Sequence, residues 1–359
     1  MTILRGLIWI AFLVLAFLTF SQPQTAPSAP AWRPSLPDLT NQEQKPNKSK
    51  EPTQPTTSPN FASWPLQPRY QIPEPRILLV EENPDTQTWL YRSPHFDFLS
   101  NAPLRPHVVR EFASLFELTH HYCRQLPFQL PRLQQQQTQP MLIQLLEHER
   151  DYVALGGLPG SGGAYLHDRD LIIVPFAGLG LKKSHRQYAL DPHRTNQTLT
   201  HETTHMLMRG PLLQDGWFVE GSAEYVATIP AKNDRLLVSE HLASIKAYIT
   251  SFGFGGKGGH NLGTNITLTP LKDFIEAPYD QFQQTPHAYP YSLLLFHFFA
   301  HQDEPGNAAR LQLYAQSLLA NSEKTTARKH LLAGRNYRTL EKLLTNSWHK
   351  HGINLSFSN

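Results

Sequence analysis

The distribution of proline limits which part of this chain can fold. Residues 21–75 contain 13 of the chain's 30 prolines, and Gln, Ser, Thr and Asn occupy many of the positions between them. Such a segment has too few apolar side chains to offset the entropy lost on ordering, and proline favours extended backbone. We therefore expect residues 21–75 to form a Pro-rich disordered linker and residues 76–359 to form the folded domain.

Residues 1–20 have a different composition. Arg5 precedes the run from Gly6 to Phe20, which is apolar almost throughout. One positive charge followed by about 15 apolar residues has the size of the hydrophobic part of a signal peptide, and Ile3 and Leu4 extend it toward the shortest membrane helix. We expect a signal peptide or an N-terminal membrane anchor, and the sequence leaves the two open. Both predict export to the cell envelope, where the chain is either secreted or periplasmic, or held by a single helix.

Charge and cysteine content exclude several classes of function. The formal net charge is +3 over 359 residues, and no basic stretch concentrates it. The chain therefore lacks the electrostatic signature of a protein that binds nucleic acid. Cys123 is the single cysteine, which excludes an internal disulfide and a cysteine-rich zinc module.

Strand patterns come first in the folded part and helix patterns follow. We predict a helix over 106–126, a hairpin from 165–166 to 171–174, and strands at 77–80, 88–92, 96–98 and 141–146. The remainder has mainly helical spacing. This order predicts an α+β fold, with an N-terminal mixed sheet and a helical C-terminal half.

The segment His201-Glu202-Thr203-Thr204-His205 carries the chemistry. On a helix, His201 and His205 lie on one face and can reach a single metal ion. Glu202 lies about 100° further round, where it can act as a base toward a water molecule at the ion. Asp191-Pro192 is a candidate start for this helix, and Arg209-Gly210-Pro211 a candidate end.

A catalytic zinc ion takes three protein ligands and keeps one position open. Trp217–Tyr225 has helical spacing and carries Glu220 and Glu224 on one face. Glu220 is the predicted third ligand, and Glu224 is placed one turn away to accept the free N–H of a histidine ligand. These residues predict one zinc ion per chain.

The pattern of His201–His205 followed by Glu220-Gly221 within Trp217–Tyr225 resembles the gluzincins, the clan of thermolysin-like peptidases, and most of all its exported peptidase MA-like domains. The resemblance covers about residues 89–350. It implies a zincin-like metallopeptidase domain with Glu220 as ligand and Glu224 supporting a ligand. The longer spacing of the aminopeptidase branch would select Glu224 as the ligand instead.

The same resemblance implies two further features. Gluzincins stabilise the oxyanion with a Tyr or His beyond the ligand helix, and here Tyr289 is the best match, with Tyr291 and His287 as alternatives. It also implies that an extended substrate pairs with an edge strand, for which we expect Leu171–Val174.

The predicted function is that of a zinc-dependent peptidase with Glu202 as general base, acting on a peptide or protein substrate. The alternative is a binding or scaffold protein on a gluzincin fold that has lost turnover. Oligomeric state and cleavage specificity are open. His120, His121 and His148 have charged or polar neighbours and are predicted to be solvated surface residues.

Overall fold

The computed structural model describes Trp64 and residues 69–358, apart from 135–138, 186, 195–196, 233–234 and 254–257. The predicted signal or anchor segment, 1–20, and most of the predicted linker therefore lie outside the described residues. Within the described ranges, no helix is both long and apolar enough to cross a membrane.

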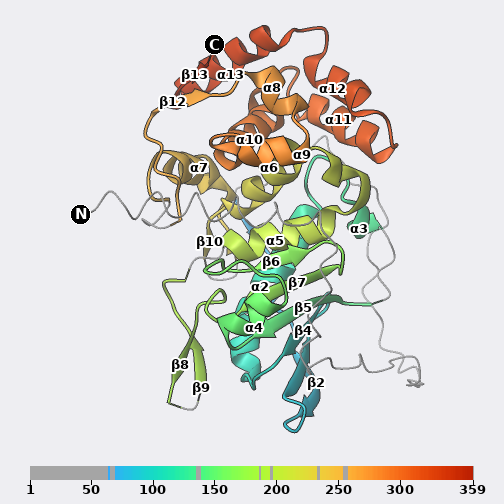
Figure 1. The fold of residues 1–359 in the computed structure, drawn as a ribbon, viewed down its shortest axis with the longest axis vertical. Helices are drawn as coiled ribbons and strands as arrows, with labels where there is room; N and C mark the ends of the chain where they lie inside the picture. The colour runs from blue at the N-terminus through green and yellow to red at the C-terminus, as the bar shows by residue number, and fades with distance from the viewer. Residues whose placement is uncertain are drawn as a thin grey trace.

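A six-stranded sheet forms the lower half of the molecule in Figure 1. Its strand order is β2-β3-β4-β5-β7-β6. The strands are β2 (Leu78–Asn83), β3 (Thr88–Arg92), β4 (Phe96–Ser100), β5 (Met141–Leu146), β7 (Leu171–Pro175) and β6 (Ala164–Leu166). The pairs β4–β5 and β5–β7 are parallel and the other three are antiparallel. The predicted mixed sheet and hairpin are therefore confirmed.

The strands β4 and β7 are buried along their whole length, and β3 and β5 are buried at all but one residue each, because helices cover them. Helix α2 (Pro106–Cys123) connects β4 to β5 and packs aromatic side chains on the sheet. The ring of Phe98 lies 5.4 Å from the rings of both Phe112 and Phe116. The helix begins at Pro106, where a missing backbone N–H costs no hydrogen bond, and it ends three residues before the predicted Leu126.

The C-terminal half is mainly helical, as predicted, and lies above the sheet in Figure 1. Helix α5 (Gln197–Met208) contacts β6 and β7, α6 (Gly216–Ala227) packs on α5, and α10 (Ala288–His297) packs on α6. The other described helices are α3 (Pro131–Gln134), α4 (Glu149–Ala154), α7 (His241–Thr250), α8 (Leu271–Glu276), α9 (Tyr279–Gln284), α11 (Ala309–Leu319), α12 (Lys324–Leu332) and α13 (Tyr337–His349), with short helical turns at η3 (Gly210–Gln214), η4 (Val238–Glu240) and η5 (Phe298–Gln302).

The predicted start of α5 is wrong, and its predicted end is confirmed. Asp191 does not cap the helix, because its carboxylate lies 2.7 Å from the Lys182 ammonium and accepts the backbone N–H of His193. The helix begins later, at Gln197. At the other end, Arg209 and Gly210 both have positive φ, 34° and 64°, which stops the helix after Met208.

A glycine sets how closely α6 and α10 pack. A Cβ atom built on Gly221 would lie 2.7 Å from the carbonyl oxygen of Ser292 and 3.1 Å from Cβ of Phe296. No side chain fits in that space, so the backbones approach here only because the residue is glycine. The residue after Glu220 thus controls the distance between the helix that carries Glu220 and the helix that carries Tyr289.

Three smaller sheets complete the fold. One has the order β1-β11-β10, one is the parallel pair β12–β13, and one is the hairpin β8–β9. Their strands are β1 (Tyr70–Gln71), β11 (Arg235–Leu236), β10 (Ala231–Lys232), β12 (Asn265–Leu268), β13 (Asn354–Phe357), β8 (Leu181–Ser184) and β9 (Gln187–Leu190).

The expected boundary of the linker at residue 75 needs correction. Trp64 is 4% exposed, its indole N–H donates to the carbonyl oxygen of Ala300 at 2.8 Å, and its ring stacks on His301. Tyr70 and Gln71 pair with β11. The folded part therefore includes Trp64. Composition describes the average polarity of a segment, so it does not reveal one large side chain that is buried in the core.

We expect Trp64→Ala to lower the free energy of unfolding by about 3 kcal/mol, the low end for truncating a buried tryptophan. Limited proteolysis should also cut the variant faster than the wild type between residues 69 and 76. Trp32→Ala, within the predicted linker, is the matched control and should change neither result. Equal proteolytic patterns for wild type and Trp64→Ala would contradict the anchor.

Candidate metal centre

Helices α5 and α6 bring three side chains to one point. Nε2 of His201 lies 2.8 Å from Nε2 of His205. Oε2 of Glu220 lies 3.2 Å from the first of these nitrogens and 3.3 Å from the second. Three potential ligand atoms, two from α5 and one from α6, therefore form a small triangle, as the sequence predicts for these residues.

The size of this triangle fits a zinc ion. Zinc binds nitrogen and oxygen ligands at about 2.0–2.2 Å in tetrahedral geometry. Neighbouring ligand atoms of such a tetrahedron are roughly 3.3 Å apart by geometry. Both distances from Glu220 match this value, and the histidine nitrogens need to separate by only about half an ångström.

Glu220 has the environment of a ligand oxygen. Its side chain is 4% exposed, and Oε2 has no hydrogen-bond donor among the described residues. Although burial acts to raise it, the imidazoles of His205 and His201 hold the pKa of the Glu220 carboxyl below its usual range. A buried carboxylate with one unsatisfied oxygen facing two imidazole nitrogens fits a cation.

Glu224 holds the His201 ring from the opposite side. Its Oε1 lies 3.2 Å from Nδ1 of His201. An ion bound at Nε2 would leave the proton of a neutral His201 on Nδ1, where the Glu224 carboxylate can accept it. Against the effect of burial, His201 keeps the pKa of the Glu224 carboxyl below its usual range, with smaller contributions from His260 and Tyr248. The geometry therefore places Glu224 behind a ligand and Glu220 among the ligands.

Glu202 lies apart from the triangle and is held by the sheet. Its Oε2 accepts the backbone N–H of Tyr165 at 2.8 Å. Tyr165 belongs to β6, the edge strand of the main sheet, and this N–H points away from β7 toward α5. The contact orients a carboxylate that belongs to the same helical turn as His201.

Two tyrosines approach the triangle, and the sequence predicts one of them. The Tyr289 ring lies 6.3 Å from the His201 ring, and the Glu220 carboxylate together with burial raises the pKa of Tyr289 well above its ordinary value. Tyr279, from the short helix α9, donates its hydroxyl to Oε1 of Glu220 at 3.1 Å. No local pattern marks Tyr279, because only the packing of α9 on α6 brings it here.

The alternatives to Tyr289 lie elsewhere. Tyr291 is fully buried and stacks on Phe274 with ring centroids 3.8 Å apart. Burial raises the pKa of Tyr291, and the negative charge of Glu341, which lies outside the metal centre, raises it further. His287 is exposed and precedes α10 with a left-handed backbone. Of the three candidates, Tyr289 is the one beside the ligands.

The prediction that both His120 and His121 are solvated surface residues is wrong for His120 and only partly correct for His121. His120 is 2% exposed, His121 is half-buried, and His148 is exposed as expected. The reason is that α2 turns its C-terminal half toward the β3–β4 turn, where His95 covers it.

Comparison with models of protein families and with curated proteins returned no match to this sequence. What the site does must therefore be argued from its own residues.

Proposed function

We propose that this chain is a zinc-dependent peptidase in which Glu202 is the general base. The observation that supports it most is the convergence of His201 Nε2, His205 Nε2 and Glu220 Oε2 at zinc-like spacings. The mixed sheet followed by two ligand-bearing helices is also the order that a zincin-like domain requires. One zinc ion held there would lower the pKa of a coordinated water toward about 7 and polarise the scissile carbonyl.

Glu202 is suited to move the proton. The amide of Tyr165 occupies Oε2, so Oε1 is the atom that we assign to proton transfer. Glu202 takes a proton from the attacking water and returns it to the leaving amine, which prevents expulsion of a poor leaving group. A binding or scaffold protein with a metal has no need of such a base, and this favours the enzyme over the alternative.

Two phenols lie beside the proposed ligands, Tyr289 near His201 and Tyr279 on Glu220. Tyr289 and Tyr279 keep their protons because burial and the Glu220 carboxylate raise both pKa values. Each is therefore a hydrogen-bond donor at any working pH. Tyr279 already donates to a ligand carboxylate, so we assign the oxyanion to Tyr289 and the positioning of Glu220 to Tyr279.

The expected substrate-binding strand needs correction. Leu171–Val174 lies within β7, which pairs with β5 on one side and β6 on the other. A paired strand has no free edge for a peptide. The edges of the sheet are β2 and β6. Of these, β6 lies beside Glu202, so we assign pairing of an extended substrate to β6. Export and N-terminal attachment remain predictions from residues 1–20.

We expect Tyr289→Phe to bind zinc like the wild type and to lower kcat by about 100-fold with little change in KM, as for removal of one oxyanion donor. Tyr279→Phe should instead weaken zinc binding by about 10-fold, because it removes a hydrogen bond to a ligand. Steady-state kinetics and zinc titration separate the two. Tyr291→Phe, whose hydroxyl is buried away from the centre, is the control. A normal kcat for Tyr289→Phe would remove it from the oxyanion role.

A further inference from the structure

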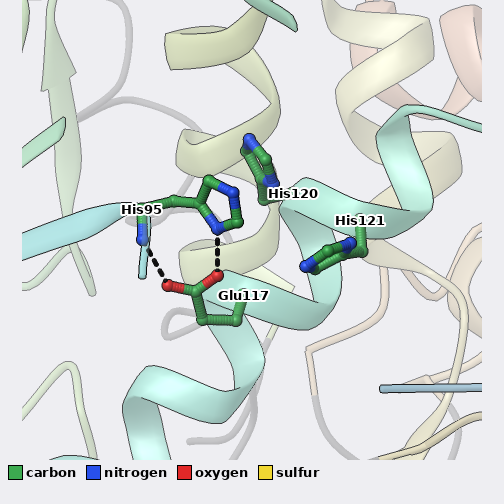
Figure 2. A group of neighbouring side chains, drawn as sticks. All are labelled: His95, Glu117, His120 and His121. Atoms are coloured by element: carbon green, nitrogen blue, oxygen red, sulfur yellow. Dashed lines mark hydrogen bonds and ion pairs between the residues drawn. The ribbon is translucent and has the colours of Figure 1, made fainter. Parts of the chain in front are cut away.

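A second group of potential metal ligands lies away from the centre described above. We call it the α2 histidine cluster, and it consists of His95, Glu117, His120 and His121 (Figure 2). His95 ends the β3–β4 turn, and the other three residues stand on the C-terminal half of α2. One ligand atom from each of the four lies within 4.8 Å of the others. None of these residues contributes to the proposed peptidase chemistry.

Glu117 brings a buried negative charge to this cluster. Its side chain is 1% exposed. Oε1 accepts the hydroxyl of Ser93 at 2.6 Å and the backbone N–H of His95 at 2.9 Å, and Oε2 lies 2.6 Å from Nδ1 of His95. In the part of the chain that the structure describes, no lysine or arginine pairs with Glu117. A buried charge is normally paired or bound to a metal, and in this cluster the group beside the Glu117 carboxylate is the His95 imidazole.

His120 leaves a nitrogen unused at the same place. The residue is 2% exposed, and its Nδ1 is buried without a hydrogen-bond partner among the described residues. Its ring stacks on His95 with centroids 3.9 Å apart and meets His121 edge-on at 5.5 Å. An imidazole nitrogen without a hydrogen-bond partner is available to a metal ion.

Packing alone does not account for this arrangement. Buried side-chain nitrogens in a packed core are nearly always hydrogen-bonded, and Nδ1 of His120 has no such partner among the described residues. Three imidazoles and one carboxylate are a donor set typical of zinc, and the lack of a thiolate argues against softer ions. His95 and His121 are partly exposed, which gives an ion a route from solvent.

We propose that the α2 histidine cluster is a second metal site, which binds a divalent transition ion of the zinc type and ties the β3–β4 turn to α2. Four protein ligands fill a tetrahedral site, so its role is structural. Binding would draw the ligand atoms together from their present spread toward about 3.3 Å. Helix α2 packs against α5, where Cys123 Sγ lies 4.0 Å from Thr204 Oγ1. An ion that fixes α2 would therefore also help to hold α5, the helix that carries His201 and His205.

The test measures the number of zinc ions bound per chain in variants that have lost a ligand from one of the two sites. Each purified full-length chain is dialysed against zinc, then against metal-free buffer, and analysed for bound metal. We expect about two ions per chain in the wild type, about one in His205→Ala, and about one in His121→Gln. The double variant His205→Ala/His121→Gln should hold essentially none. His148→Ala, which changes an exposed histidine, is the control and should match the wild type.

A second readout reports the ligands directly. In the His205→Ala background, Co²⁺ should give the visible absorption of a tetrahedral site, and Glu117→Gln should weaken Co²⁺ binding by at least about 10-fold. His121 is partly exposed, so its variant is expected to fold, as circular dichroism will show. A His205→Ala chain that holds no ion, or one whose ion persists when His121→Gln and Glu117→Gln are added, would overturn the proposal. If only the first centre fails to bind metal, the wild type and His205→Ala each hold about one ion and His121→Gln holds none, so the two proposals fail separately.

Discussion

The Glu202→Gln chain is expected to fold and to hold zinc like the wild type, yet to hydrolyse peptides at least about 100-fold more slowly. Glutamine keeps the size of the side chain and an oxygen that accepts the Tyr165 N–H. It cannot accept a proton from water at neutral pH, so the base is lost while the neighbouring ligands stay in place. The effect should fall on kcat, because Glu202 acts in the transition state.

This variant separates an enzyme from a metal-bearing scaffold. Zinc content is measured by elemental analysis, and activity by digestion of a broad peptide library. Glu111→Gln, an exposed carboxylate on α2, is the matched control and should retain full activity. Equal cleavage by wild type and Glu202→Gln of every peptide tested would exclude the peptidase and leave the scaffold.

Removal of a single ligand should release the zinc of the first centre. In His205→Ala and in Glu220→Ala we expect the metal content to fall by about one ion per chain and peptide hydrolysis to disappear, because a three-ligand site keeps little affinity after losing one. Glu224→Gln should retain the ion with an affinity lowered by about 10- to 100-fold, since Glu224 contacts only Nδ1 of His201.

The comparison of Glu220 with Glu224 decides between the two ligand spacings. Zinc titration of each variant, in the presence of a competing chelator, gives the affinity directly. A normal affinity in Glu220→Ala together with complete loss in Glu224→Ala would mean that the longer spacing supplies the ligand, against the distances of 3.2 and 3.3 Å from Glu220.

Much of the local structure could be predicted from periodicity. The strands β3 and β5 and the hairpin β6–β7 occur where alternating or continuous apolar runs place them. The pairing of His201 with His205 follows from helix geometry alone, because residues four apart share a face. These features depend on residues close in sequence, and the sequence contains that information without any tertiary contact.

The start of α5 shows where local rules fail. Asp191-Pro192 has the composition of a helix start, but Asp191 instead pairs with Lys182 across the β8–β9 hairpin. Trp64 shows the same limit, because a proline-rich segment still contributes one side chain to the core. In both cases a contact with a distant residue outweighs a weak local preference.

By itself, the sequence determined the helix face that carries His201 and His205, the Glu202 carboxylate beside them, and the two carboxylates one turn apart on the next helix. Only the tertiary structure decided that the carboxylate of Glu220, and not that of Glu224, lies close to the Nε2 atoms of both His201 and His205. It also brought Tyr279 to Glu220, made β6 rather than β7 the sheet edge, and joined His95 to His120 and His121. The physical reason is that these contacts depend on the angles and distances between elements. Interior packing sets those distances, as Gly221 does against the Ser292 carbonyl, and packing is a property of all the buried side chains together.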